Sequence, residues 1–267
     1  MTDFGRLKLS TPGSMRLRLI FALDVGSLRE ALDLVRKLHA EVGMFKVGKQ
    51  LFLHEGPHIV RRIRDLGGEV FLDLKFHDIP RTVAKAAAEA TRLGVNMFDL
   101  HASGSKEMME RAVHEVNKIC RTENLARPKM LAVTVLTSLN REDLRLVGVR
   151  SGVQHQVVRL ARLALEAGMD GVVASPHEIA PIRTECGRSF LIVTPGVRPG
   201  EGSWEDQKRV MTPEAAIQNG ADYLVVGSPI RDARAPVAAA REIVEAMERG
   251  FLARGRRTRP DSGPSEK

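Results

Sequence analysis

The sequence is poor in cysteine, in tryptophan and tyrosine, and in long apolar runs. It contains two cysteines, one tryptophan and one tyrosine in 267 residues. Cys120 and Cys186 lie far apart without a metal-type spacing, so we expect reduced thiols in a cytoplasmic protein and not a disulfide framework. No apolar run approaches the roughly 20 residues that span a bilayer, and the N-terminus lacks the features of a signal peptide. These absences argue against a secreted disulfide-rich protein and against a membrane protein.

Positive charge, in contrast, is in excess. The chain has 41 Lys and Arg against 33 Asp and Glu, a net charge of +8. Part of this excess lies in residues 251–267, which we predict to be a disordered basic tail because they are polar and contain Gly and Pro. Such a tail can touch nucleic acid, but a solubilising role is the simpler interpretation and we expect no nucleic-acid partner. The remaining excess suits an anionic, phosphorylated substrate.

Apolar β-type segments alternate with helical segments along the chain. We predict eight strands, at residues 18–25, 44–48, 70–76, 96–101, 129–136, 171–174, 190–194 and 223–226. This alternation predicts a parallel sheet, and eight units in about 240 residues match a closed (β/α)8 TIM barrel. We expect this single α/β domain to span residues 16–250, after an N-terminal extension at residues 1–15. An open doubly wound sheet is the alternative, but the turn after the first strand lacks its glycine-rich motif.

The helical segments between these strands are predicted from their caps and composition. Ser27, with Glu30 three residues later, is typical of a capping box at the start of the first helix. One helix is expected over residues 56–66 and another from residue 228 to about residue 250. The connection at residues 140–152 is expected to be long and polar.

The run FLDLKFHDIP at residues 71–80 places charged groups at the end of an otherwise apolar strand. Side chains alternate along a strand, so Asp73 and Lys75 should point the same way, opposite to Leu74. Asp78 follows one short loop later, and Pro80 can open a helix. A simple ion pair at a strand end is the alternative interpretation. Burying charges costs several kcal/mol each unless they are paired, so the cluster favours a functional site.

Polar residues at the ends of other strands should converge on the same site, because barrels of this kind hold their active sites at the C-terminal strand ends. Asp24 lies at the end of the first strand, Lys46 near the end of the second, and Thr137 directly after the fifth. Each residue alone is weak evidence, since a lysine after a strand is often a solvated rim residue. Together they place lysines and acids around one opening.

The loops after the seventh and eighth strands have features of a phosphate site. Gly196 and Gly227 let backbone N–H groups approach an anion, and the helix that opens at Ser228 presents its positive end. Arg198 and Gln207 add donors on the long loop, which is our candidate for a segment that closes over the substrate. The alternative is that these glycines only make tight turns.

Together these motifs resemble those of the orotidine 5'-phosphate decarboxylase family. Besides FLDLKFHDIP, they are ALD at residues 22–24, FKVGK at 45–49, HASG at 101–104, VTVLTS at 133–138, TPGVRP at 194–199 and DQKRVMTPEAA at 206–216. The resemblance covers nearly the whole chain except its two ends. It implies a cytoplasmic, homodimeric barrel that converts orotidine 5'-monophosphate to UMP and CO2 in de novo pyrimidine biosynthesis. It also implies that the reaction needs neither a metal ion nor an organic cofactor.

The resemblance further implies a role for each site residue. Lys75 would protonate C6 of the pyrimidine as CO2 leaves, in a charge network with Lys46, Asp73 and the partner subunit's Asp78. Asp73 would lie against the substrate carboxylate, and Asp24 with Lys46 would hold the ribose hydroxyls. The other implied contacts are Ile79 and Thr82 across the dimer interface, Thr137 at the pyrimidine or ribose, and Arg198, Gln207 and Gly227 at the phosphate.

One position departs from the family pattern. After the eighth strand the family usually reads Gly-Arg-Pro, with the arginine on the phosphate, whereas this chain reads Gly227-Ser228-Pro229. Ser228 offers a hydroxyl and a backbone N–H but no bidentate charged contact. Arg231, one turn later, is the candidate to replace the missing arginine.

Two rival functions remain open from the sequence. Sugar-phosphate decarboxylases or aldolases of the same superfamily share the D-x-K-x-x-D pattern but use a divalent metal, and HDIP with VTVLTS favours the orotidine enzyme over them. A non-catalytic, basic nucleotide- or RNA-binding protein is supported by the arginine tail and by Ser228, but the four charged site residues argue against it. His77 and His101 are expected to be hydrogen-bonded structural residues.

Overall fold

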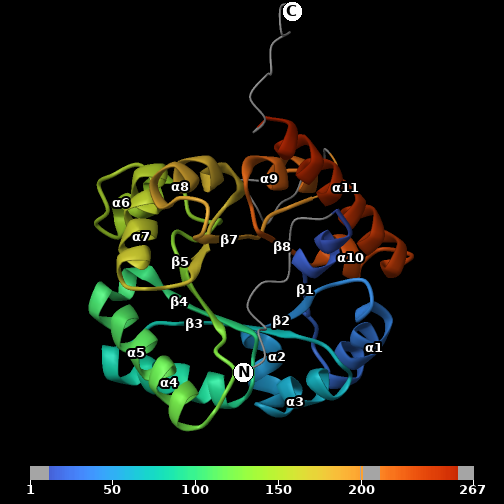
Figure 1. Ribbon diagram of the computed structural model, residues 1–267, viewed down its shortest axis with the longest axis horizontal. Coiled ribbons are helices and arrows are strands. Elements are labelled where there is room, and N and C mark those ends of the chain that lie inside the picture. Colours follow the sequence, from blue (N-terminus) through green and yellow to red (C-terminus); the bar gives the residue numbers. More distant parts are fainter. Residues whose placement is uncertain (1–11, 199, 201–210, 258–267) are drawn as a thin grey trace, which may run out of the picture.

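The computed structural model describes residues 12–198, 200 and 211–257, and within them eight parallel strands close into a barrel (Figure 1). The strands are β1 (Leu19–Ala22), β2 (Met44–Gly48), β3 (Val70–Phe76), β4 (Met97–His101), β5 (Lys129–Val133), β6 (Gly171–Val173), β7 (Leu191–Thr194) and β8 (Tyr223–Val226). Each strand pairs with the next in the chain, and β8 pairs with β1. The predicted (β/α)8 barrel is therefore confirmed.

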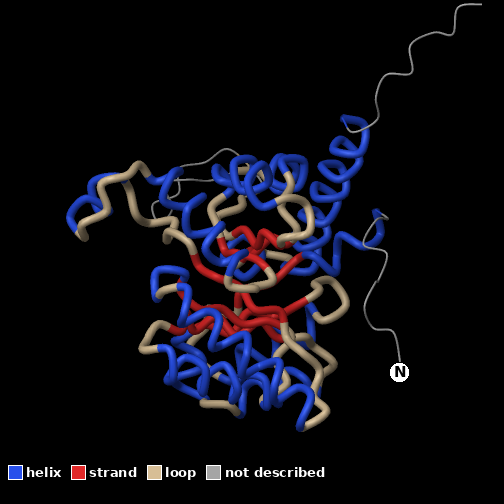
Figure 2. The backbone as a smooth tube through the Cα atoms, turned by 60° about the vertical axis from the view of Figure 1, so that its left-hand side comes forward, coloured by secondary structure: helices blue, strands red, loops and turns tan. Residues whose placement is uncertain are grey.

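Helices surround the strands, as the side view in Figure 2 shows. The α-helices are α1 (Leu28–Leu38), α2 (Lys49–Glu55), α3 (His58–Asp65), α4 (Pro80–Arg92), α5 (Lys106–Thr122), α6 (Arg141–Leu146), α7 (Val153–Glu166), α8 (Ile179–Cys186), α9 (Pro213–Asn219), α10 (Ser228–Arg231) and α11 (Pro236–Arg257). Short 3₁₀ helices are η1 (Pro12–Arg18), η2 (Ala102–Gly104) and η3 (Pro176–Glu178). None of the helices in the described part of the chain is both long and apolar enough to cross a membrane.

The alternation of side chains along the strands divides the core into two parts. The inner cluster fills the barrel and consists of Ile20, Ala22, Met44, Phe71, Met97, Leu131, Val193 and Val225. The outer cluster packs the other face of the strands against the helices, and Phe21, Phe98 and Leu100 belong to it. Positions two apart on a strand thus share a face, so a polar side chain in register with the inner cluster, such as Asp99 after Met97, points into the barrel.

Three predicted helical connections differ from the structure. The helix expected over residues 56–66 is α3, but the structure places a further helix, α2, before it. Gly56, with a φ of 62°, and Pro57 separate the two helices. The helix expected from residue 228 is split into α10 and α11, with Pro236 as the first residue of α11. The polar connection at residues 140–152 contains α6, which a capping box between Asn140 and Asp143 starts.

The two predicted chain ends also differ in part. Helix α11 continues through Gly250 to Arg257, so the segment predicted as a tail from residue 251 begins as helix. At the other end, η1 overlaps the extension predicted at residues 1–15, and Met15 is fully buried in the outer cluster. Neither segment has a periodic pattern in the sequence, because each is short and its order depends on packing against the barrel.

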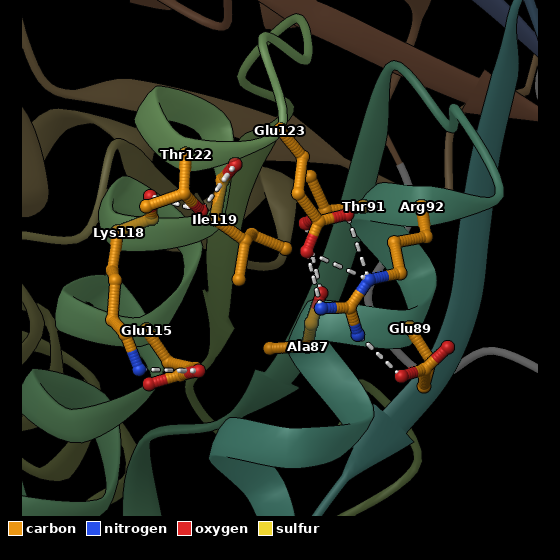
Figure 3. A network of polar contacts seen from close by, with 9 residues as sticks. All are labelled: Ala87, Glu89, Thr91, Arg92, Glu115, Lys118, Ile119, Thr122 and Glu123. Atoms are coloured by element: carbon orange, nitrogen blue, oxygen red, sulfur yellow. Dashed lines mark hydrogen bonds and ion pairs between the residues drawn. The ribbon is translucent and has the colours of Figure 1, made fainter.

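Helices α4 and α5 lie side by side, and a polar network joins their C-terminal ends (Figure 3). The Arg92 guanidinium donates hydrogen bonds to Glu123 at 2.9 Å and 2.5 Å and to Glu89 at 2.5 Å. Such exposed ion pairs contribute little to stability. The buried alanines of α4, among them Ala87 and Ala88, instead allow the close packing that fixes α4 after β3.

Candidate active site

A cavity of about 340 Å³ opens at the C-terminal ends of the strands. Its polar lining consists of Asp24, Lys46, Asp73, Lys75, Asp99, Thr137, Arg198, Ser228 and Arg231, and Gly196 and Gly227 also line it. Apolar side chains of the inner cluster, including Phe71 and Val225, form the floor. The strand ends therefore bring together most of the residues that the sequence predicted.

Four of these side chains form a row of alternating charge. Lys46 Nζ lies 3.1 Å from Asp24 Oδ1 and 3.1 Å from Asp73 Oδ2. The other oxygen of Asp73, Oδ1, pairs with Lys75 Nζ. Each ammonium thus touches a carboxylate, and Asp73 touches both lysines. Such pairing compensates the loss of hydration that these partly buried charges suffer.

The pKa directions follow from this arrangement. Burial raises the pKa of the Asp73 carboxyl, but the Lys46 and Lys75 ammonium groups outweigh burial and hold that pKa well below its usual range. Burial lowers the pKa of Lys46, but the Asp73 and Asp24 carboxylates outweigh it and raise that pKa. At neutral pH the row therefore contains an ionised Asp73 between two cations.

The end of β3 is irregular where it carries this row. Lys75 has a φ of 53°, in the left-handed region that non-glycine residues rarely occupy. The pairing of β3 with β4 shifts register between Leu72 and Phe76. As predicted, Asp73 and Lys75 project to the same side, while Leu72, Leu74 and Phe76 pack on the other side in or against the outer cluster. The register shift is a bulge in β3, and bulges are common beside functional sites.

Asp99 on β4 is a site residue that the sequence analysis missed. Its side chain is 1% exposed, and its Oδ1 accepts a hydrogen bond of 2.8 Å from the Lys75 backbone N–H. Its Oδ2 lies 3.9 Å from Lys75 Nζ. The available signal was an acid at an inward-facing position in the apolar strand MFDLH. That signal was weaker than a motif, because nothing in the sequence indicates that Asp99 faces Lys75.

The predicted phosphate loops lie at the opposite side of the cavity from β3 and β4. Arg198 is buried, and its backbone N–H donates a 3.1 Å hydrogen bond to the Met211 carbonyl. Gly196 has a φ of 79°, which requires glycine at this turn. Gln207, also predicted here, lies outside the described residues. Helix α10 is a single turn, so its peptide dipoles add less positive potential than the longer predicted helix would.

Arg231 lines the cavity but already has partners in this chain. Its Nη1 donates a 2.9 Å hydrogen bond to the backbone carbonyl of Asp24, and its Nε and Nη2 donate to Asp232 at 2.6 Å and 2.9 Å. Ser228 is the first residue of α10 and also lines the cavity. The guanidinium thus lies near the predicted phosphate loops but is held toward Asp24 and Asp232.

Three predicted residues do not line the cavity of their own chain. Asp78, Ile79 and Thr82 lie at the start of α4 and are exposed, with Ile79 at 66%. Asp78 Oδ1 accepts a 2.6 Å hydrogen bond from the Ile79 backbone N–H. The short loop between Lys75 and Asp78 suggested that Asp78 would lie beside Asp73 and Lys75 of its own chain. In the structure, Asp78 does not line the cavity that holds these two residues.

The two histidines near β3 and β4 also lie outside the cavity lining. The rings of His77 and His101 have centroids 5.3 Å apart. Burial, followed by the neighbouring His77, lowers the pKa of His101 to about 4. In the described part of the chain, no cluster of His, Cys, Asp and Glu is arranged to hold a metal ion.

Comparisons with known proteins agree with this geometry. Residues 17–243 match the family model described as "Orotidine 5'-phosphate decarboxylase / HUMPS family". The chain is 57% identical over 232 residues to orotidine 5'-phosphate decarboxylase from Syntrophotalea carbinolica, covering 87% of this chain and 95% of the relative. It is 55% identical over 240 residues to the enzyme of the same name from Geobacter sulfurreducens, covering 90% and 100%. The crystal structure of orotidine 5'-phosphate decarboxylase from Lactobacillus acidophilus is 35% identical, with a TM-score of 0.76 and coverage of 86% and 98%.

Proposed function

This chain belongs to the orotidine 5'-phosphate decarboxylase / HUMPS family, and on that premise we propose how its residues perform the reaction. It decarboxylates orotidine 5'-monophosphate to UMP in pyrimidine biosynthesis. The observation that carries the proposed roles is the row of Asp24, Lys46, Asp73 and Lys75 at the strand ends. A fixed row of this kind can stabilise a charge that develops on a bound pyrimidine.

Lys75 is the general acid in this proposal. When the bond between C6 and the carboxyl carbon breaks, CO2 leaves and the electron pair stays on C6. The pyrimidine ring cannot delocalise that pair well, so a fixed ammonium beside C6 lowers the barrier. A proton then moves from Lys75 Nζ to C6, which forms the C–H bond of UMP and leaves a neutral amine. The left-handed backbone at Lys75 supports this role, because strained conformations cluster at functional sites.

Asp73 lies against the substrate carboxylate in this proposal. Its low pKa keeps it ionised, so two negative groups meet before the reaction and the repulsion ends when neutral CO2 departs. Asp73 has a second function that does not depend on this repulsion, because it pairs with both Lys46 and Lys75 and fixes their positions.

The rest of the cavity binds the nucleotide. Asp24 and Lys46 hold the ribose hydroxyls, and Thr137 meets the pyrimidine or the ribose. The phosphate lies on the other side, where the proposed contacts are Arg198, Gln207, Gly227, Ser228 and Arg231. Binding energy from the phosphate, remote from C6, can then be used to order the site around the reacting carbon.

A second subunit completes the site in this proposal. The partner subunit's Asp78 joins the charge row, and the partner's Ile79 and Thr82 cover the substrate. The exposure of these residues in the isolated chain supports the idea, because an apolar side chain such as Ile79 is readily buried in a symmetric dimer. The proposal includes a cytoplasmic location, which the two free thiols support, and a reaction without metal ion or organic cofactor.

The test is conversion of orotidine 5'-monophosphate to UMP, followed by absorbance in the presence of EDTA. Wild type should turn over, and Lys75→Ala should lose about 10³-fold or more in kcat. Lys118→Ala is the matched control, since Lys118 is an exposed lysine on α5 outside the cavity, and it should keep full activity.

Two outcomes would contradict the proposal. Turnover that EDTA abolishes and a divalent metal restores would favour the metal-dependent sugar-phosphate chemistry of the same superfamily. Lys75→Ala activity within tenfold of wild type would remove Lys75 from the role of general acid.

A further inference from the structure

The pairing of β3 with β4 contains a mismatch, because three residues of β3 lie opposite a single residue of β4. Leu72 pairs with Phe98, and Phe76 pairs with Leu100. Between these pairs, β3 contains Asp73, Leu74 and Lys75, whereas β4 contains Asp99 alone. The two extra residues on β3 form a bulge, in the part of the strand where Asp73 and Lys75 face the cavity. Asp99 is therefore the residue of β4 that lies opposite the bulge.

A bulge leaves backbone groups without their usual partners in the sheet. At Lys75 the left-handed conformation adds a cost of about 1–3 kcal/mol for a residue with a side chain. Asp99 Oδ1 compensates both effects, because it accepts the Lys75 backbone N–H at 2.8 Å. A buried N–H without an acceptor would cost about as much as a lost hydrogen bond. The conformation of Lys75 is thus held by the Asp99 side chain.

The other oxygen of Asp99, Oδ2, differs from Oδ1 in its surroundings. Oδ2 is fully buried and receives no hydrogen bond from any residue that the structure describes. It lies 3.9 Å from Lys75 Nζ, which is already paired with Asp73. The Asp99 and Asp73 carboxyl groups are close enough to interact by a hydrogen bond. Two carboxylates have no proton to share, so such a bond requires that one of them is protonated.

We propose that Asp99 is a neutral positioning residue for the decarboxylation: Oδ1 accepts the Lys75 backbone N–H, and a proton on Oδ2 donates to the Asp73 carboxylate. The inference rests on the proposed roles of Lys75 and Asp73. The neutral Asp99 carboxyl then fixes both the backbone of Lys75, the general acid, and the orientation of the Asp73 carboxylate. It also leaves the charge row balanced, with Asp24 and Asp73 against Lys46 and Lys75.

The surroundings favour the proton on Asp99 and not on Asp73. Burial, followed by the Asp73 charge, raises the pKa of Asp99 well above its usual range. The charged groups that act on Asp99 are Asp73 and Lys75, both on β3. Lys46 and Lys75 pair directly with Asp73, so Asp73 keeps its negative charge and Asp99 takes the proton.

The variants Asp99→Asn and Asp99→Leu separate this arrangement from its alternatives. Asparagine keeps an acceptor for Lys75 N–H and a donor toward Asp73, so kcat should stay within about threefold of wild type and show the same pH profile. Leucine keeps the size but neither contact, so kcat should fall about 100-fold, as expected when a reacting group is misplaced. KM for orotidine 5'-monophosphate should change little in both variants, because the phosphate and ribose contacts lie elsewhere.

Infrared difference spectra of wild type against Asp99→Asn give a readout that needs no turnover. A carbonyl band of a protonated carboxylic acid, present at pH 7 only in wild type, would support the proposal. Absence of this band, or a loss of kcat in Asp99→Asn as large as in Asp99→Leu, would overturn it. Wild-type kcat in Asp99→Leu would overturn it as well. If wild type itself fails to turn over, the proposed function is wrong, while the infrared band still decides the state of Asp99.

Discussion

Ser228 is a single residue on which the affinity of the proposed phosphate site should depend. It lies at the start of α10 and lines the cavity where the resemblance implies an arginine on the phosphate. A hydroxyl makes a weaker contact with a phosphate than a guanidinium, which donates two charge-assisted hydrogen bonds. Arg231, the candidate replacement, already donates to Asp24 and Asp232. This chain therefore directs less positive charge at the proposed phosphate position than a chain with the Gly-Arg-Pro pattern would.

We expect Ser228→Arg to improve phosphate binding. A new charge-assisted contact of about 1.5–3 kcal/mol corresponds to a roughly tenfold or larger gain in kcat/KM for orotidine 5'-monophosphate. Steady-state kinetics measure it, and Ser228→Lys is the control that adds a charge without the planar fork. If Ser228→Arg brings no gain, Arg231 or another donor already binds the phosphate, and Arg231→Ala should then raise KM.

Helix α11 shows how an element can be misread from its residues. The sequence predicted that the last helix ends near Gly250, because glycine often terminates helices. In the structure Gly250 lies inside α11, and a Cβ at this position would collide with the Glu214 carbonyl oxygen of α9. Gly250 is therefore a contact residue that lets two helices approach closely. Gly255, in the same helix, has open space at the Cβ position.

These two glycines should respond in opposite directions to alanine. Gly250→Ala should lower the free energy of unfolding by about 1–3 kcal/mol, because α11 must move away from α9. Gly255→Ala should raise it by about 0.5–1 kcal/mol, because alanine is the better helix former and meets no obstacle. Urea denaturation of both variants and wild type measures the difference. Equal effects at the two positions would show that Gly250 is not a packing contact.

The whole molecule decides whether each active site is complete. Asp78 is exposed at the start of α4 and lies apart from the cavity of its own chain. A symmetric dimer that places it in the neighbouring site gives every site residues from two chains. Lys75 and Asp78 of one subunit would then act in different sites, which can be tested by mixing subunits.

We expect the inactive variants Lys75→Ala and Asp78→Ala to regain activity when their subunits exchange. In a heterodimer one site has both Lys75 and Asp78 intact, so random exchange of equal amounts should restore about a quarter of wild-type activity. Lys75→Ala mixed with the Lys75→Ala/Asp78→Ala double variant is the control and should stay inactive. Native mass spectrometry verifies the exchange, and heterodimers without activity would contradict the shared site.

The sequence by itself determined the barrel and most of its polar opening. Eight apolar segments alternating with helices specify a parallel barrel, and each strand end can be located by where its apolar residues stop. For this reason the sequence was sufficient to predict Asp24, Lys46, Asp73 and Lys75 as site residues, since the strand ends meet at one edge in any such barrel. Local patterns are sufficient for such features because they depend only on periodicity and chain order.

Only the tertiary structure decided which residues act on these groups from other elements. The bulge in β3 and the left-handed Lys75 depend on the register with β4, and they make Asp99 a partner of Lys75 from 24 residues away. Arg231 bonds to Asp24 across 207 residues, and Gly250 serves the packing of α11 on α9. These contacts join segments far apart in the chain. Such contacts leave no local pattern in the sequence, because the two partners become neighbours only when the barrel closes.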